Sequence, residues 1–280
     1  MPPIADADRI AALALEEDGT SDITSELTVS PAIKGFGVIE YRSGGVLAGR
    51  EYATAVARAC GCSVDWNVPD GGDVRAGSTV GLVAGELRGI LRAERPLLNL
   101  LQRASGIANT TRAFVEAVEG TGCRVLHTRK TAPTLRSLDI AAVLSGGGLR
   151  HRGDLAHEVM VKDNHWQALA REGARLGHAL SEARRRGITA LYVEVESVEQ
   201  LEVACAAGAS RLLVDNQSPD TLHEWIGLAR QRSPQIEIEA TGGITLENAR
   251  AYAVAGANFI SIGALTHSVH AADIALEIKF

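Results

Sequence analysis

Apolar and polar residues follow two different patterns along the chain. In about the first hundred residues, short alternating runs are mixed with short amphipathic stretches, as is typical of an α+β domain. We expect the last helix of this part to be broken by Pro96 and relaxed at Gly106. The elements predicted here are helices at 8–17, 50–59 and 91–118, a hairpin at 35–49 with a Ser-Gly-Gly turn, and short strands within 62–87.

After Gly122 the pattern changes to apolar runs separated by amphipathic helices, two of which have expected N-caps at Ser197 and Ser218. Strands from residue 190 onward begin roughly every 20–25 residues, a spacing shared by parallel barrels and doubly wound sheets. Short loops, without a signal for reversed strand order, favour the barrel. The predicted strands are 123–128, 158–163, 190–196, 211–216, 236–243 and 258–263, and the predicted helices are 166–186, 199–207, 218–231 and 246–255.

Each predicted strand in this second part ends in polar residues or glycines. In a β/α barrel the catalytic groups collect at that end of the strands. Any single polar tip can also be a helix cap or a solvated turn, but six in succession with complementary chemistry favour a site. The tips are Thr128-Arg129-Lys130, Lys162-Asp163-Asn164, Glu194 with Glu196, Asp215-Asn216, Thr241-Gly242-Gly243 and Gly263-Ala264.

These groups fall into three chemical sets. The glycines after the last two strands expose backbone N–H groups, as in the phosphate cradle of barrel enzymes. Glu194 and Asp215 offer hard carboxylate oxygens to Mg²⁺ or to ribose hydroxyls. A third set of cations suits carboxylates and further phosphates, and together the sets fit a sugar phosphate and a small polyanionic acid. The cations are Arg129, Lys130, His151, Arg152 and Lys162.

Composition narrows the ligand further. The formal net charge is −6, yet cations gather between His127 and His165, which indicates an anion site; a solvated basic loop is the plainer alternative. The acidic pI, without an aromatic-rich basic surface, argues against nucleic acid. No apolar run approaches the roughly 20 residues that span a bilayer. The N-terminus lacks the basic region of a signal peptide, and four scattered cysteines suit a reducing cytoplasm.

Eight sequence words, in order and spacing, resemble quinolinate phosphoribosyltransferase, the decarboxylating nicotinate-nucleotide pyrophosphorylase family. They are LLNLLQRASGIANTT, HTRKTAPTLR, SGGGLRHR, VMVKDNH, VEVE, AGASRLLVDN, EATGGITLENAR and ISIGALTHS. The resemblance covers nearly the whole chain. It implies an N-terminal α/β open-faced sandwich domain joined to an incomplete, seven-stranded α/β barrel. We therefore expect domains at 1–110 and 111–265, with 266–280 completing the first.

The resemblance implies phosphoribosyl transfer from phosphoribosyl pyrophosphate to quinolinate, with decarboxylation and with Mg²⁺ as cofactor. It implies a homodimer with shared active sites, in which Arg103 reaches a substrate carboxylate across the interface; a higher oligomer stays open. Magnesium is expected at Glu194 and Asp215, directly or through water. The expected catalytic residues are Lys130, Lys162, Glu194 and Asp215, and the expected substrate-binding residues are these four with Arg103, Arg129, His151, Arg152, Thr241, Gly242, Gly243, Gly263 and Ala264.

The chain departs from the family pattern in two places. Leu149 and Arg150 replace a polar pair after the triple glycine, and Ile140 stands where a lysine is frequent. These changes leave the identity of the pyridine acid open. The alternatives are a paralogue that uses another carboxylated heterocycle, and a non-catalytic sugar-phosphate-binding relative of the group linked to molybdenum transport. The intact VKDNH strand and the retained cations and acids oppose the last of these.

Overall fold

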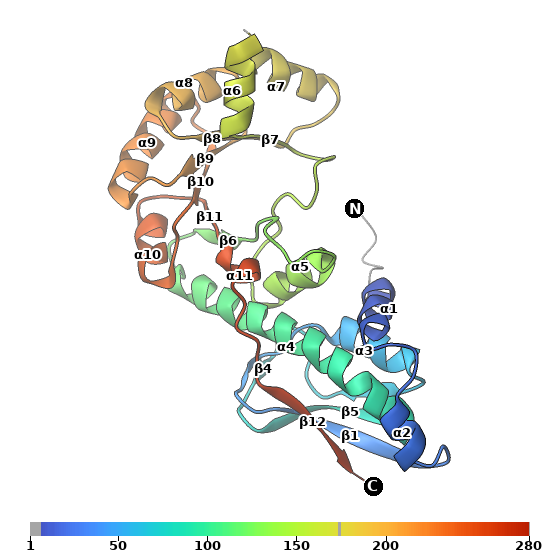
Figure 1. Cartoon of the computed structure of the whole chain (residues 1–280). Coiled ribbons are helices and arrows are strands. Elements are labelled where there is room, and N and C mark those ends of the chain that lie inside the picture. Colours follow the sequence, from blue (N-terminus) through green and yellow to red (C-terminus); the bar gives the residue numbers. More distant parts are fainter. Residues whose placement is uncertain (1–6, 173–174, 280) are drawn as a thin grey trace. The chain divides into compact units, whose positions relative to one another are not determined.

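The computed structural model describes residues 7–172 and 175–279, which form two compact units. Unit 1 comprises Met1–Arg112, Lys130–Gly148 and Ala264–Phe280, and unit 2 comprises Ala113–Arg129 and Leu149–Gly263. The chain therefore crosses between the units several times (Figure 1). The sequence-based domain boundaries at 110 and 265 stay a prediction.

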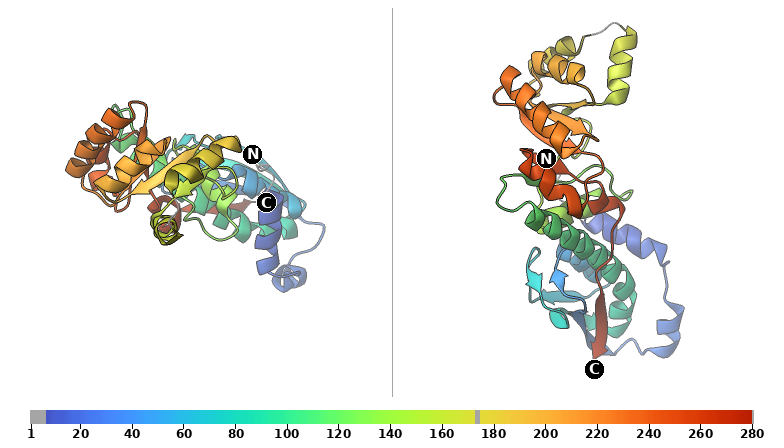
Figure 2. Two further views of the ribbon diagram at one scale, coloured as in Figure 1. Left: turned by 90° about the horizontal axis from the view of Figure 1, so that it is seen from above. Right: turned by 90° about the vertical axis from the view of Figure 1, so that its left-hand side faces the viewer.

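Unit 1 is built on an antiparallel sheet with the order β12-β1-β5-β3. Its central strand β1 pairs with β5 on one edge and with β12, from the end of the chain, on the other (Figures 1 and 2). The hairpin expected at 35–49 is wrong, because both edges of β1 are occupied and β2 pairs with β4 instead. The strands are β1 (Lys34–Tyr41), β2 (Gly45–Val46), β3 (Ser63–Trp66), β4 (Asp73–Val74), β5 (Ser78–Glu86) and β12 (Ile274–Lys279).

The longest helix, α4, runs through Pro96 without interruption, so the expected break there is wrong. A proline inside a helix costs about 3 kcal/mol. Leu97, the next residue, and Leu101, one turn after it, are both fully buried. Burial of each such side chain contributes about 1.5–3 kcal/mol, which offsets the cost of the proline. The helices of unit 1 are α1 (Ala7–Glu17), α2 (Ile23–Thr28), α3 (Arg50–Ala59), α4 (Leu87–Ala117, whose last residues belong to unit 2), α5 (Arg136–Ser145) and α11 (Ala264–His267).

Gly106 allows the segment that leads to β12 to lie against α4. A Cβ at this position would come within 2.1 Å of the carbonyl oxygen of His270. Nearby, Ala272 N donates a hydrogen bond of 2.9 Å to Gln102 O, and the Gln102 side chain donates to Ile274 O. Helix and segment are therefore in backbone contact. The glycine is required by this close approach rather than by any relaxation of the helix.

Gly106→Ala is expected to destabilise the protein by about 1–3 kcal/mol, because the added methyl group meets backbone that cannot rotate away. Gly227→Ala, also inside a helix, is the matched control: its Cβ would meet nothing within 4 Å, so it should stabilise by about 0.5–1 kcal/mol. Urea unfolding of both variants measures the difference. Equal effects of the two substitutions would contradict the close approach at His270.

Unit 2 contains a parallel sheet with the order β6-β11-β10-β9-β8-β7. Helices α8, α9 and α10 cover one face of it (Figure 1). The helix expected at 166–186 is two helices, and residues 173–174 between them lie outside the described residues. The elements are β6 (Arg124–Leu126), β7 (Val159–Val161), α6 (Asp163–Glu172), α7 (Leu176–Arg185), β8 (Leu191–Val195), α8 (Val198–Ala206), β9 (Arg211–Asp215), α9 (Pro219–Arg232), β10 (Glu237–Thr241), α10 (Leu246–Val254) and β11 (Phe259–Ser261).

The sheet is incomplete, as expected, but the described part of the chain gives it six strands where seven were implied. The seventh segment joins it only through an isolated parallel bridge between Leu149 and Leu126. Leu149 N donates a good bond of 2.8 Å to Val125 O, but the next bond, from His127 N to Leu149 O, is long at 3.5 Å. The pairing therefore ends after one residue.

The helices and the cysteines bear on two further sequence expectations. Within residues 7–172 and 175–279, no helix is both long and apolar enough to cross a membrane. Cys60, Cys62, Cys123 and Cys205 are all free thiols.

Candidate functional site

The strands of unit 2 place the polar candidates on one face of the sheet. Side chains two residues apart on a strand share a face. On β9 this rule puts Asp215 on the same face as Arg211, and on β10 it puts Thr241 on the same face as Glu239. The register aligns Thr241 with Asp215 across the two strands. The carboxyl ends of neighbouring strands thus carry the expected site residues side by side.

Lys162 and Glu194 form an ion pair between the ends of β7 and β8. The Glu194 side chain is buried, with 8% of its surface exposed, and the Lys162 side chain is 43% exposed. The indole of Trp166 donates a 2.8 Å hydrogen bond to Glu194 O, and the backbone N–H of Lys162 donates to His165 Nδ1 at 3.0 Å. The backbone groups of both residues are thus bonded to neighbouring side chains, and the Lys162 side chain stays partly exposed.

The surroundings of Asp215 disfavour its ionised form. Burial raises the pKa of Asp215, the neighbouring charges of Glu194 and Glu196 raise it further, and Lys162 only partly counteracts them. The following residue, Asn216, has a positive φ of 54° and donates a 2.6 Å bond to the Asp215 carboxylate. Positive φ is uncommon for a non-glycine residue, although asparagine adopts it more readily than most, and strained residues cluster at functional sites. A cation at this position would relieve the repulsion.

Gly242 and Gly243 form a bend immediately after β10. Their φ angles are 82° and 60°, and a Cβ on Gly242 would lie 2.2 Å from the side-chain oxygen of Asn216. At Gly243 nothing lies within 4 Å of such a Cβ, so the bend is open on that side. Among the described residues, no acceptor is hydrogen-bonded to either backbone N–H. Paired N–H groups in this conformation suit an anion.

Two arginines in unit 2 have buried donors that lack acceptors. The Nε atoms of Arg129 and Arg152 are buried and have no hydrogen-bond partner among the described residues. Burial lowers the pKa of Arg152, and the like charge of Arg129 lowers it further, against the opposing charges of Glu158 and Asp154. Buried unsatisfied donors cost about 1–3 kcal/mol each, and an anionic ligand would supply acceptors for them. Glu158, whose charge acts on Arg152, likewise has a buried carboxylate oxygen without a partner among the described residues.

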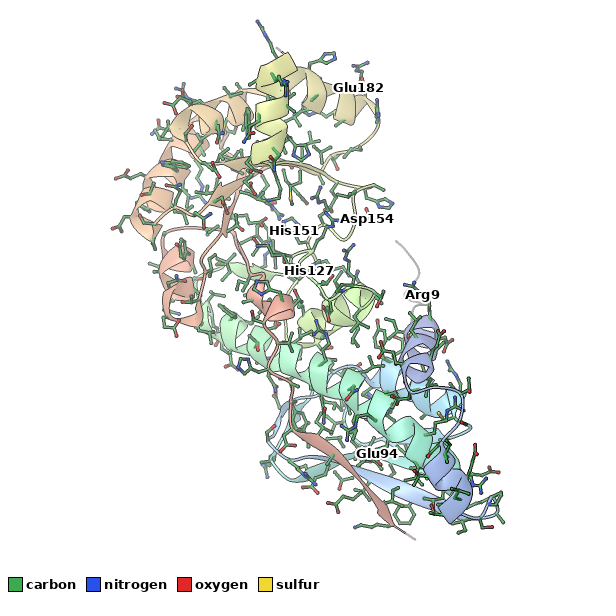
Figure 3. The ribbon with its side chains drawn as sticks, viewed as in Figure 1. Arg9, Glu94, His127, His151, Asp154 and Glu182 are labelled. Carbon is green, nitrogen blue, oxygen red and sulfur yellow. The ribbon has the colours of Figure 1, made fainter. Side chains whose placement is uncertain are left out.

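His151 lies on the loop before β7 (Figure 3) and does not point a free nitrogen into the site. Its Nε2 contacts the carboxylate of Glu239 at 2.9 Å, and its Nδ1 accepts a hydrogen bond from the backbone N–H of Arg152. Both ring nitrogens are thus engaged by protein. Sequence reasoning missed Glu239, although its place two residues before Thr241 on the same strand face was a readable signal.

Arg103, Lys130 and Ala264 belong to unit 1. The guanidinium of Arg103 makes two parallel 2.8 Å bonds to Asp139, and its Nη2 also donates to Thr266 O. Asp139, another residue that sequence reasoning missed, accepts a third bond from the backbone N–H of Ala132. The Thr266 hydroxyl donates to Lys130 O. Arg103 is therefore an anchor for the Lys130 loop inside its own chain.

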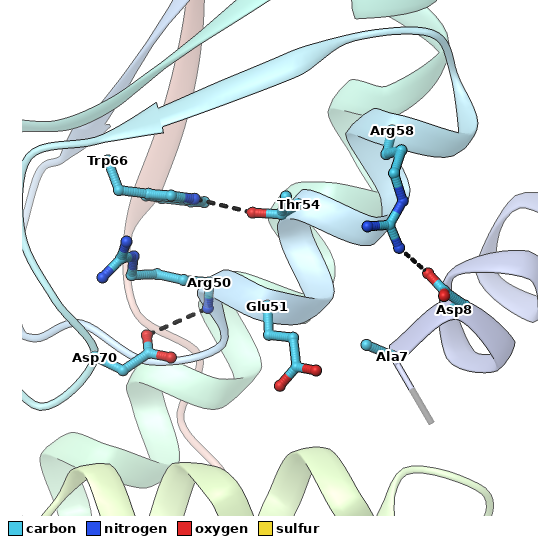
Figure 4. Close-up of a pocket in the computed structure, with 8 residues that line it drawn as sticks. All are labelled: Ala7, Asp8, Arg50, Glu51, Thr54, Arg58, Trp66 and Asp70. Carbon is cyan, nitrogen blue, oxygen red and sulfur yellow. Dashed lines mark hydrogen bonds and ion pairs between the residues drawn. The ribbon is translucent and has the colours of Figure 1, made fainter. Parts of the chain in front are cut away.

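Unit 1 also contains a hollow of about 390 Å³ between α1 and α3 (Figure 4). Arg58 in its wall is paired with Asp8, and the Arg50 guanidinium lies 5.5 Å over the Trp66 ring. Three carboxylates line it against two arginines, so it lacks the cationic excess of an anion site. None of the expected site residues lines it. The lining residues are Ala7, Asp8, Arg50, Glu51, Thr54, Arg58, Trp66 and Asp70.

Comparison with known proteins agrees with this geometry. Residues 22–105 match the family model of the quinolinate phosphoribosyl transferase N-terminal domain, and residues 107–277 match that of the C-terminal domain. A nicotinate-nucleotide pyrophosphorylase (carboxylating) from Mycobacterium leprae is 37% identical over 261 residues, which cover 92% of this chain and 91% of the relative. The human protein of that name is 38% identical over 241 residues, covering 85% and 80%.

The fold is similar to that of a solved nicotinate-nucleotide pyrophosphorylase from Francisella tularensis. The TM-score is 0.89 at 29% sequence identity, and the alignment covers 100% of this chain and 98% of the other. The match thus includes both the antiparallel sheet of unit 1 and the parallel sheet of unit 2. By sequence along nearly its whole length and by fold, the chain belongs to the quinolinate phosphoribosyltransferase family.

Proposed function

We propose that this protein transfers phosphoribose from phosphoribosyl pyrophosphate to quinolinate and releases CO₂, pyrophosphate and nicotinate mononucleotide, a step of NAD biosynthesis. The observation that carries the proposal is the pair of buried Nε donors on Arg129 and Arg152, which have no acceptor among residues 7–172 and 175–279. A planar dicarboxylate supplies the acceptors that such donors require. Relatives more than a third identical carry the name nicotinate-nucleotide pyrophosphorylase (carboxylating).

The residues divide by the part of each substrate that they suit. The cations around Arg129 and Arg152 suit the two carboxylates of quinolinate, and Arg103 is assigned to one of these carboxylates across a subunit interface. Lys130 and Lys162 suit the pyrophosphate, and Glu194 and Asp215 suit the ribose. The 5′-phosphate cradle is assigned to Thr241, Gly242, Gly243, Gly263 and Ala264.

The first bond change joins the pyridine nitrogen to ribose C1 while the C1–O bond to pyrophosphate breaks. Positive charge develops on the sugar, and the carboxylates of Glu194 and Asp215 stabilise it. The leaving pyrophosphate takes the electron pair and is stabilised by the ammonium groups of Lys130 and Lys162. The C–CO₂ bond beside the ring nitrogen then breaks, its electrons remain on the ring carbon next to the cationic nitrogen, and a proton from water replaces CO₂.

Magnesium fits this site only as an ion shared with substrate. In the described part of the chain, no group of three or more His, Cys, Asp or Glu residues could hold a metal ion by itself. Glu194 and Asp215 offer hard oxygen ligands, and the raised pKa of Asp215, due first to burial and then to Glu194, marks a place where a cation is favourable. Glu194 and Asp215 would hold magnesium there, and the ion would neutralise charge on the leaving group.

One assay tests the function directly. The purified protein is incubated with quinolinate, phosphoribosyl pyrophosphate and Mg²⁺, and nicotinate mononucleotide and CO₂ are measured. We expect both products in equal amounts. Turnover with another carboxylated heterocycle but not with quinolinate would overturn the proposal in favour of the paralogue, with Arg150 and Ile140 as the residues to revert. Binding without turnover of any acid would indicate the non-catalytic relative.

We further propose a cytoplasmic homodimer with active sites shared between subunits. The free cysteines suit the compartment, and the assignment of Arg103 to a neighbouring site requires the dimer. Arg103→Ala and Glu194→Ala proteins should each be nearly inactive, and their mixture should regain up to about a quarter of the wild-type activity, because one site in a mixed dimer keeps both residues. Mixed dimers that remain inactive would rule out shared sites.

A further inference from the structure

Glu239 is a buried carboxylate at the centre of a polar cluster in unit 2. Its side chain is 1% exposed. Three groups approach it: the His151 imidazole, with Nε2 at 2.9 and 3.1 Å from the two carboxylate oxygens, the Arg211 guanidinium at 3.2 Å, and the hydroxyl of Ser261. Burial raises the pKa of Glu239, but the hydrogen bonds from His151 and Ser261 and the charge of Arg211 are among the causes that lower it overall. The carboxylate is therefore ionised.

The partners of His151 determine its tautomer. The backbone N–H of Arg152 can only donate, so Nδ1 of His151 must carry a lone pair. An ionised carboxylate can only accept, so Nε2 must carry the proton. A continuous chain of hydrogen bonds thus runs from Glu239 through the imidazole to the backbone of Arg152. Arg152 is, with Arg129, one of the two arginines of unit 2 whose buried Nε lacks an acceptor among the described residues.

Arg211 donates a hydrogen bond to the same carboxylate. Its guanidinium lies 4.0 Å from the centroid of the Phe259 ring and 4.7 Å from that of the Tyr192 ring, so the two rings pack against it. It is shared between Glu239 and Glu237, the latter at 2.7 Å. Glu237 is 43% exposed and does not touch His151. The two glutamates therefore share one partner, and only Glu239 is connected to the anion site.

We propose that Glu239 is a positioning residue that fixes the His151 tautomer and thereby aims Arg152 at a carboxylate of the acid substrate. The inference rests on the proposed function for the identity of that acid. It assigns His151 a role through the Arg152 backbone rather than through direct contact with substrate. The hydrogen-bond chain itself is a property of the folded protein and can be tested without turnover.

The test compares Glu239→Gln with the matched control Glu237→Gln. Both variants remove one carboxylate from Arg211, but only the first removes the acceptor of His151 Nε2. Glu239→Gln is expected to raise the KM for quinolinate up to roughly 100-fold, with a smaller change for phosphoribosyl pyrophosphate, because a small displacement of Arg152 weakens its contact with the acid. Glu237→Gln should change either KM by less than about fivefold, the effect of a partly exposed ion pair.

Nitrogen-15 spectra of histidine-labelled protein provide the second readout, with the His151 signals assigned by their loss in His151→Gln. We expect a protonated Nε2 and an unprotonated Nδ1 in the wild type and in Glu237→Gln, and a changed pattern in Glu239→Gln. An unaltered His151 pattern in Glu239→Gln, or equal KM changes in both variants, would overturn the inference. A wild type without quinolinate turnover would instead refute the proposed function, while the spectra still decide the Glu239–His151 contact.

Discussion

Asp215→Asn is expected to lower kcat/KM by roughly 10²–10³-fold and at the same time to raise the melting temperature. The loss follows from removal of a carboxylate that stabilises charge on the ribose. The gain follows from the raised pKa of Asp215, whose causes are burial first and then Glu194. Activity and thermal unfolding of the same preparation provide both measurements.

The sign of the stability change comes from proton linkage. A raised pKa means that the folded protein binds this proton more tightly than the unfolded chain does, so stability falls as pH rises from the ordinary aspartate pKa through the raised one. Above that window the ionised Asp215 costs stability, and Asn removes the cost. On the acid side, activity should begin to fall at a higher pH than for an ordinary aspartate.

A second substitution, which also removes one negative charge, tests whether the stability gain comes from the electrostatics at Asp215. Glu196 is exposed and raises the pKa of Asp215 less than Glu194 does. Glu196→Gln should therefore raise the melting temperature by less than Asp215→Asn. A lower melting temperature in Asp215→Asn would contradict the electrostatic stress at this position, and activity within tenfold of the wild type would remove Asp215 from the catalytic set.

Arg103→Ala is expected to cost about 3–5 kcal/mol of unfolding free energy, the second large effect. Asp139 has no exposed side-chain surface, whereas the Arg103 side chain is 24% exposed. Removing the arginine leaves a buried carboxylate whose remaining hydrogen bond comes from Ala132 N. Urea unfolding at constant pH measures the loss.

Asp139→Asn is the matched substitution on the other side of the pair. The stranded Arg103 is still reached by water, so the cost should be smaller, about 1–3 kcal/mol. The order of the two costs is the prediction, and the reverse order would contradict it. Because Arg103 anchors its own chain, inactivity of Arg103→Ala alone does not demonstrate contact with substrate. The mixing of subunits is the experiment that separates the two roles.

Most elements of unit 2 could be predicted because local signals there agree with the fold. Each of the six strands lies within its predicted range, and the caps at Ser197 and Ser218 accept the expected backbone bonds from Gln200 and Thr221. Apolar runs between capped helices leave few alternative structures. The candidate site was predicted from the same pattern, since the carboxyl ends of parallel strands meet at one edge, and its residue roles stay a prediction.

Unit 1 was harder to predict because its pairings join distant parts of the chain. The alternation at 35–49 is typical of a hairpin, but β1 pairs with β5 and β12, which begin at Ser78 and Ile274. Pro96 is a helix breaker locally, and the buried leucines after it outweigh that cost. In both cases the local preference was read correctly, but strand pairing or burial in the folded protein outweighed it.

The sequence by itself determined the family, the parallel sheet and the kinds of group at its edge, since these depend on local periodicity and on short words. Only the tertiary structure decided how those groups are used. It paired Arg103 with the buried Asp139 and placed the two ring nitrogens of His151 in contact with Glu239 and Arg152. Within the part of the chain that the structure describes, it left the Nε donors of Arg129 and Arg152 without acceptors. The physical reason is burial. A side chain removed from water must find its hydrogen-bond partners nearby, and those partners come from strands and loops far away in the sequence.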